Sequence, residues 1–159
     1  DQVANLPLSP PQSASLGAEN SIDVILTFRN THGWIGAGLA DTIFAEFARV
    51  LKPGGILGVV QHRAPEGSDP EKMADSGYVA ESAVVALARK AGLYLEARSE
   101  VNGNPADTHD HEAGVWTLPP NLRMCRDLEG EDEIAACRGK YQAIGESDRM
   151  TLRFRKPLM

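Results

Sequence analysis

Residues 22–61 read IDVILTFRNTHGWIGAGLADTIFAEFARVLKPGGILGVVQ, and this stretch decides the fold. The apolar, β-branched run Ile22–Phe28 predicts a strand that is buried on both faces, as parallel sheets require. Apolar side chains then recur at helical spacing and predict a helix over Ala37–Leu51. Lys52–Gly55 ends that helix, because proline cannot continue it and glycine accepts a left-handed turn. Ile56–Val60 predicts a second buried strand, which completes a strand–helix–strand unit.

The length and charge of the chain limit its class. A chain of 159 residues can bury a real core, so we predict one domain over residues 1–159. Its 22 acidic and 16 basic side chains give a formal net charge of −6. This balance disfavours nucleic acid and membrane surfaces as partners, because both attract clustered lysine and arginine. No apolar run approaches the roughly 20 residues of a membrane helix, and no signal peptide is visible at Asp1, so we expect a cytoplasmic protein.

Cys125 and Cys137 leave one alternative about the compartment open. They lie twelve residues apart in a polar segment, and we favour two free thiols. The alternative is a local disulfide, which requires an oxidising compartment and would indicate the periplasm. Two cysteines make a zinc site improbable, because structural zinc takes four ligands.

The remaining strands extend the first unit into a doubly wound α/β sheet. A helix that begins near Asp75 or Ser76 and ends at Gly92 precedes an alternating strand at Tyr94–Val101. Crossovers between parallel strands are right-handed, so we expect the first three strands to run in parallel. Met150–Lys156 alternates apolar and basic residues and lacks a clear crossover helix. We therefore expect it to run antiparallel, inserted beside the third strand.

Two segments show little regular pattern. Asp1–Ser21 is rich in proline and serine and predicts a loop or a short edge element. Residues 102–148 form a long insertion before the last strand, with one short helix expected at Glu131–Tyr141. Insertions of this length are usually functional or mobile. Within it, Glu146–Arg149 is expected to form a turn, with an ion pair, that ties the insertion to the last strand.

Several motifs resemble the second half of a class I S-adenosylmethionine-dependent methyltransferase. They are Ser21–Phe28, Arg49–Leu57 with its Leu-Lys-Pro-Gly-Gly turn, and Ala88–Leu93 before the third strand. A bacterial group of these proteins shares an Arg-Asn-x-His loop and an Ile-Gly-Glu-Ser-Asp-Arg-Met-Thr segment, which stand here at Arg29–His32 and Ile144–Thr151. The resemblance implies a partial Rossmann-like sheet with an antiparallel C-terminal strand. It also implies methyl transfer from S-adenosylmethionine to an acceptor, which the acidic charge balance favours as a small molecule.

The same resemblance implies that the N-terminal half of the usual domain is absent. Members of this class hold the cofactor mainly with a glycine-rich turn after their first strand and an acid after their second. Here Gly36–Gly38 follows a different strand and lacks an acid at the matching distance. We therefore expect an incomplete enzyme that binds S-adenosylmethionine poorly alone. A complementary N-terminal segment or a homo-oligomer would cover the exposed sheet edge.

Polar side chains follow the two predicted central strands, where ligands bind in open parallel sheets. Either His32 or His62 could take a proton from the acceptor, because the ordinary pKa of histidine is about 6.5. We predict both as catalytic residues. The predicted substrate-binding residues are Asn30, Trp34, Arg63 and Asn102, and the predicted cofactor-binding residues are Arg29 and Asn30. A purely structural role stays open for several of them: Arg29 and His62 could cap strand ends, and Trp34 could pack under the insertion.

Two other classes of function also stay open. The chain could be a non-catalytic binding or structural protein that retains half of the scaffold. It could instead be a metal-dependent enzyme that uses His109 and His111, which stand among carboxylates. We favour a solvated acidic loop there and assign no metal, because residues so close in sequence seldom all turn toward one point.

Overall fold

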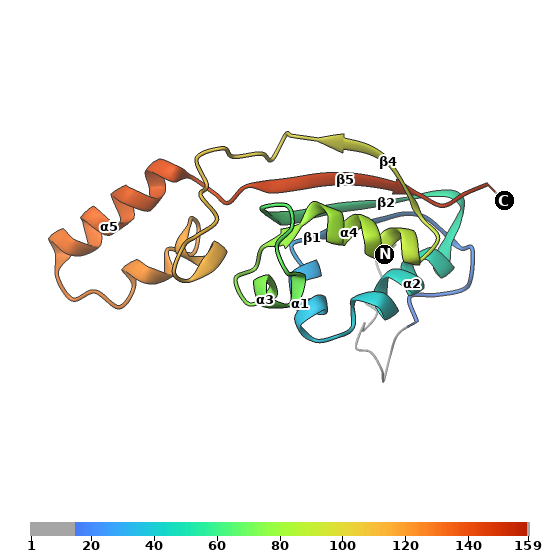
Figure 1. Ribbon diagram of the computed structural model, residues 1–159, viewed down its shortest axis with the longest axis horizontal. Helices are drawn as coiled ribbons and strands as arrows, with labels where there is room; N and C mark the ends of the chain where they lie inside the picture. The colour runs from blue at the N-terminus through green and yellow to red at the C-terminus, as the bar shows by residue number, and fades with distance from the viewer. Residues whose placement is uncertain (1–14, 159) are drawn as a thin grey trace, which may run out of the picture.

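The last strand of the chain lies inside the sheet. The computed structural model describes residues 15–158, so most of the predicted N-terminal loop or edge element lies outside the described residues. The sheet has the order β1-β2-β5-β4 (Figure 1), with a short β3 paired to the end of β2. β1 pairs in parallel with β2, whereas β5 pairs antiparallel with both β2 and β4. The predicted α/β class and the inserted antiparallel strand are confirmed. The bounds are β1 Ile22–Phe28, β2 Leu51–Ala64, β3 Val79–Ala80, β4 Tyr94–Ser99 and β5 Arg149–Arg155.

The Leu-Lys-Pro-Gly-Gly segment lies within β2 and not between two elements. β2 begins at Leu51, directly after the preceding helix, and is longer at both ends than the predicted strand. Its pairing with β1 places Ile22 opposite Leu51 but Val24 opposite Ile56, so the intervening residues bulge out of the ladder. Gly54 has a φ of +79°, which suits glycine. The motif therefore ends the helix as predicted, while the strand pairing continues on either side of it.

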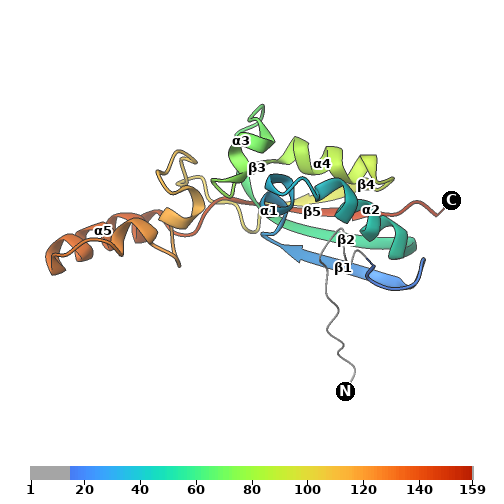
Figure 2. The same ribbon diagram turned by 90° about the horizontal axis from the view of Figure 1, so that it is seen from below.

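Helices cover one face of the sheet (Figure 2). The helix predicted over residues 37–51 begins only at residue 40, because Gly38 has a φ of +68°, and a further short helix, which was not predicted, occupies residues 31–36. The helix expected to begin at residue 75 or 76 begins later, because Gly77 has a φ of +82° and the next residues extend along β2 as β3. The helices are α1 Thr31–Gly36, α2 Ala40–Val50, α3 Pro70–Ala74 and α4 Glu81–Lys90.

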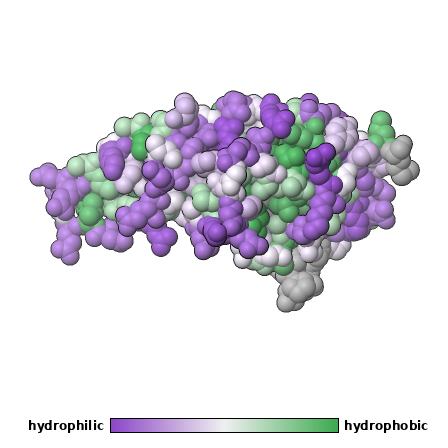
Figure 3. Space-filling model, in the orientation of Figure 1, coloured by the Kyte–Doolittle hydropathy of each residue, from purple (hydrophilic) through white to green (hydrophobic). Residues whose placement is uncertain are grey.

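The core lies between this helical layer and the sheet. Leu57 lies opposite Phe154 and Val59 opposite Leu152, so all four side chains share one face of the sheet. That face packs against α2, where Phe44 is fully buried. Burying each such side chain contributes roughly 1.5–3 kcal/mol to folding. The space-filling view shows the helical face, with apolar side chains gathered over α2 and α4 (Figure 3).

The other face of the sheet carries no helix within residues 15–158 (Figure 2). On β1 the side chains of Val24, Leu26 and Phe28 are 51%, 61% and 56% exposed. Their partners on β2, Ile56 and Val60 among them, lie on the same face. The prediction that β1 is buried on both faces is therefore wrong for the described chain.

The insertion between β4 and β5 projects from the end of the sheet as an arm (Figures 1 and 2). It contains the short helices η1 Gly114–Thr117 and η2 Arg123–Cys125, and then α5 Glu131–Ile144, which extends the predicted helix by one turn. α5 has no buried residue and packs against η2, where a disulfide joins Cys125 to Cys137. The preference for free thiols is wrong, and the disulfide alternative holds. No helix in the described part of the chain is long and apolar enough to cross a bilayer.

Candidate functional site

The carboxyl ends of β1 and β2 meet the start of β5 at a small pocket. Arg29 directly follows β1, and His62 near the end of β2 lies opposite Arg149 of β5. The pocket has a volume of about 180 Å³. Its lining is Arg29, His62, Val115, Trp116, Pro119, Pro120, Asn121, Glu146, Ser147 and Arg149. It therefore lies at the edge of the sheet where open α/β folds bind ligands, and residues from the insertion close it.

His62 is the polar centre of this pocket. Its side chain is buried, and its Nδ1 atom lies 2.5 Å from the Oγ atom of Ser147, which is also buried. Burial lowers the pKa of His62 to about 3, and the neighbouring His32, Arg29 and Arg149 act in the same direction. The imidazole is therefore neutral near pH 7. Because so weak a base takes up a proton poorly near pH 7, His62 is better suited to orient an acceptor by a hydrogen bond than to act as its base.

His32 approaches His62 from α1. The two ring centroids are 6.0 Å apart, and the His32 ring lies 5.8 Å from that of Trp116. Burial lowers the pKa of His32, although a side-chain hydrogen bond with Gln61, 3.3 Å away, opposes the shift. The structure thus brings the two predicted catalytic histidines together. It also keeps both of them below their ordinary pKa.

Of the two predicted cofactor contacts, Arg29 lines the pocket and Asn30 does not. Arg29 has a φ of +59°, its N–H donates to the carbonyl of Val60, and its side chain lines the pocket. Asn30 precedes α1, and its amide donates to the Oγ1 atom of Thr27 at 3.3 Å. Asn30 does not line the pocket, so its predicted contacts with substrate and cofactor stay predictions.

Trp34 lies among the aromatic side chains of the helical layer. Its ring meets those of Phe44 and Phe47 edge-on, with centroids 6.5 and 5.7 Å away. It does not line the pocket of His62. Trp116, on the inserted arm, lies beside His32, and the predicted substrate contact of Trp34 stays a prediction. No local sequence pattern indicates the contact between Trp116 and His32, because the two residues lie far apart along the chain.

Arg63 and Asn102 tie the insertion to the sheet. The Arg63 guanidinium donates two hydrogen bonds to Asp148 and two to Glu100, and both carboxylates raise its pKa further above the ordinary value. Burial opposes the charge on Asp148, but Arg63 and the N–H of Asn104 together hold the pKa of that carboxyl below its usual range. Asn102 donates to the Oγ1 atom of Thr151 at 2.8 Å. Neither Arg63 nor Asn102 lines the pocket, and their substrate roles stay predictions.

A buried polar network holds the base of the arm. Asp107 accepts from the hydroxyl of Tyr78 at 2.9 Å and from the N–H of Asp148 at 2.8 Å. The Nε2 atom of His111 lies 3.0 Å from Asp107, whereas that of His109 lies 3.4 Å from Asp148. Burial, followed by the charge on Asp107, raises the pKa of Tyr78 above its usual range. The two histidines face different carboxylates, and residues 15–158 contain no group of three or more histidine, cysteine or carboxylate side chains arranged for a metal.

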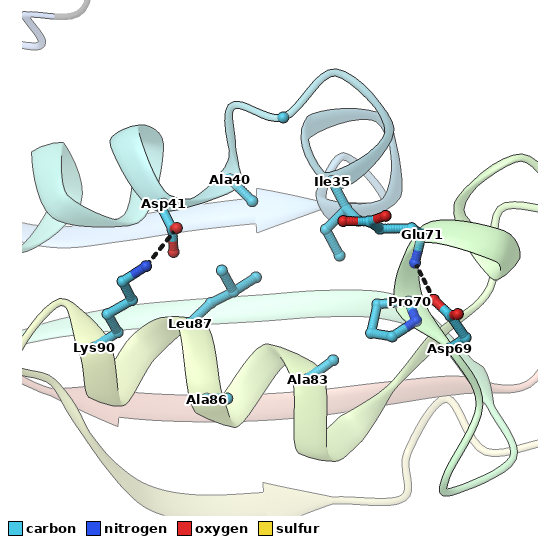
Figure 4. A pocket seen from close by; sticks show the side chains of 11 residues that line it. Ile35, Ala40, Asp41, Asp69, Pro70, Glu71, Ala83, Ala86, Leu87 and Lys90 are labelled. Carbon is cyan, nitrogen blue, oxygen red and sulfur yellow. Dashed lines mark hydrogen bonds and ion pairs between the residues drawn. The ribbon is translucent and has the colours of Figure 1, made fainter.

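A larger hollow of about 460 Å³ lies on the helical face, between α2, α3 and α4 (Figure 4). Apolar side chains such as Ile35, Ala83 and Leu87 line its floor, and an ion pair between Asp41 and Lys90 lies at one end. None of the predicted site residues line this hollow. The pocket of His62 is the better candidate for chemistry, because buried titratable side chains gather there.

The fold is that of a Rossmann-like α/β domain of the kind found in S-adenosylmethionine-dependent methyltransferases. No protein-family model and no curated sequence matches the chain. Similar solved structures include a protein assigned as a sarcosine dimethylglycine methyltransferase from Galdieria sulphuraria, with 17% identity and a TM-score of 0.54 over 90% of this chain and 56% of that one. The cyclase SpnF aligns with 21% identity and a TM-score of 0.55, over 91% of this chain and 53% of SpnF. A methyltransferase from Methanosarcina mazei aligns with 12% identity and a TM-score of 0.51, over 89% of this chain and 62% of that one.

These similarities establish the fold, and the chain spans only between 53% and 62% of the length of these three structures. SpnF is named as a cyclase, so the shared fold does not fix one reaction. The activity has to be argued from the site.

Proposed function

We propose that this chain is the C-terminal part of an S-adenosylmethionine-dependent methyltransferase that acts on a small molecule. The observation that carries the proposal is the pocket of His62 and Arg29, which lies at the carboxyl ends of β1 and β2. The sheet that holds it is similar to those of methyltransferases along nearly the whole chain. The acceptor would occupy this pocket and extend from it along the sheet edge.

Methyl transfer is an in-line displacement, so positioning of the acceptor is the main requirement. S-adenosylmethionine supplies the electrophilic methyl group when it is bound. The neutral imidazole of His62, held by Ser147, would orient the acceptor atom by a hydrogen bond. The ring of His32 lies beside that of His62, and Trp116 would shield the site from water.

The described residues do not fit the cofactor by themselves. Arg29 is the only predicted cofactor contact that lines the pocket, and Asn30 is engaged with Thr27. Among residues 15–158, no glycine-rich turn with a following acid lines the pocket. We infer that the cofactor site is completed by a complementary segment that pairs with β1, whose apolar side chains Leu26 and Phe28 are exposed.

The disulfide between Cys125 and Cys137 indicates the cellular compartment of the protein. Cys125 is buried and joined to Cys137, and disulfides persist mainly in oxidising compartments. We infer that the periplasmic alternative fits the chain better than the cytoplasmic one.

Transfer of labelled methyl groups from S-adenosylmethionine to a panel of small molecules tests the proposal. The sample is the protein purified from its native source, with any segment or partner that pairs with β1 retained. We expect transfer, and we expect His62→Gln to reduce it at least tenfold while Lys72→Gln, a control at an exposed ion pair, leaves it unchanged. Binding of small molecules without transfer, in a sample that binds no cofactor, would favour the non-catalytic binding protein instead.

A further inference from the structure

The side chains that line the pocket carry a net positive charge. Glu146 is the only acid in its lining, and it forms an ion pair with Arg149. Arg29 forms no ion pair with any residue from 15 to 158, and His62 brings no negative charge. The guanidinium group of Arg29, an exposed residue of the lining, therefore has no counterion from the described chain.

Two buried polar atoms in the same lining also lack partners. The Nε atom of Arg149 and the Oδ1 atom of Asn121 are buried and form no hydrogen bond within the described chain. The Arg149 Nε–H is a donor that requires an acceptor, and buried donors without one are rare. The amide of Asn121 can present either its oxygen or its nitrogen to a ligand.

We propose that this pocket binds the carboxylate or phosphate group of a small molecule, held between Arg29 and Arg149. Guanidinium groups present paired donors that match both anions, whereas neutral acceptors leave the charge unbalanced. Ser147, whose hydroxyl also contacts His62, and Asn121, whose amide would have to present its nitrogen, complete the polar lining.

The volume of about 180 Å³ is small beside whole-ligand pockets, which are roughly 300–1,000 Å³. The pocket therefore holds the anionic end of a ligand, and the remainder extends from it along the sheet edge. That the ligand is the methyl acceptor rests on the proposed function. The anion site itself does not require the cofactor.

Binding of inorganic phosphate and of acetate to the full chain, without S-adenosylmethionine, tests the proposal. Amide and indole NMR shifts would be followed at constant ionic strength, and the two anions distinguish phosphate-bearing from carboxylate-bearing ligands. We expect saturable shifts at Arg29, Trp116 and Ser147 with at least one anion. Absence of saturable shifts with both anions would overturn the proposal.

Two variants locate the site. Arg29→Asn removes the charge but suits the left-handed backbone at φ +59°, so the variant should fold. Arg149→Gln removes the second guanidinium. Each is expected to weaken anion binding about tenfold, since a hydrogen bond to a charged group is lost. Arg153→Gln is the matched control on β5, because Arg153 pairs with Glu96 away from the pocket, and it should bind as the unchanged protein does.

Equal weakening by the Arg153 control would show a general charge effect and overturn the site. Anion binding at the pocket by a protein that transfers no methyl group would keep this inference and reject the proposed function. Methyl transfer with no anion binding would reject the anion site and keep the proposed function.

Discussion

The Nδ1 atom of His62 lies 2.5 Å from the Oγ atom of Ser147, and this contact joins the end of β2 to the segment that leads into β5. Both side chains are buried, and His62 stands among Arg29, Arg149 and His32. His62 therefore stays neutral at pH values between about 3 and 6.5, at which an ordinary histidine takes up a proton. That property makes folding stability depend on pH.

His62→Gln should remove part of this dependence. Unfolded His62 binds a proton below its ordinary pKa of 6.5, whereas the folded form does so only near about 3. The unfolded state therefore binds more protons across this window, and the free energy of unfolding falls as the pH drops. For His62 alone the loss between pH 7 and pH 5 is about 2 kcal/mol.

Urea unfolding of the unchanged protein and the glutamine variant at pH 7 and pH 5 measures this difference. Carboxylates and His32 contribute equally to both proteins, so the variant should lose about 2 kcal/mol less on acidification. Equal losses would show that His62 titrates normally in the folded state.

Asp148→Asn should destabilise the fold more than Glu100→Gln, although both acids pair with Arg63. The Asp148 side chain is 10% exposed and also accepts from the N–H of Asn104, whereas the Glu100 side chain is 65% exposed. We expect a loss of about 2 kcal/mol for the buried partner and less than about 1 kcal/mol for the exposed one. Urea midpoints of the two variants decide the matter, and a larger loss for Glu100→Gln would contradict the roles assigned here.

Reduction of the Cys125–Cys137 disulfide should release α5 without unfolding the sheet. α5 has no buried residue, and an isolated helix of its length is marginal in water. Hydrogen exchange should therefore show lost protection over residues 131–144, with protection of β2 and β5 retained. The double variant Cys125→Ser with Cys137→Ser should behave in the same way, and loss of sheet protection in either sample would show that the arm supports the core.

Leu26→Ala and Leu57→Ala test which face of the sheet is covered. They lie on adjacent strands, and Leu26 is 61% exposed whereas Leu57 is fully buried. In this chain alone we expect Leu57→Ala to cost about 2–5 kcal/mol and Leu26→Ala less than about 1 kcal/mol. Similar losses measured by urea unfolding would show that the outer face of β1 is covered after all.

Local patterns predicted the longer strands and the larger helices but not β3, because hydrophobic spacing and the Leu-Lys-Pro-Gly-Gly turn act over short distances. The same patterns could not show that one face of β1 stays uncovered, since Val24 and Leu26 read as core residues whether or not a partner covers them. α1 was missed because six residues carry too little periodicity.

The site was predictable only in part. His32 lies in α1 just after β1, and His62 lies near the end of the adjacent β2, so the sheet itself brings them together. Trp116, Ser147 and Arg149 reach the pocket through the folded arm and the antiparallel strand, which no local pattern specifies. The preference for two free thiols was wrong, because a spacing of 12 residues does not reveal whether two thiols meet.

Calorimetric titration of S-adenosylmethionine tests the central claim most directly. It should be run on residues 1–159 alone and on the protein purified from its native source with any segment that pairs with β1 retained. We predict a single saturable site in the native sample and little or no heat from residues 1–159 alone. An absence of saturable heat from the native sample would contradict the methyltransferase assignment, and tight binding by residues 1–159 alone would contradict the need for a complementary segment.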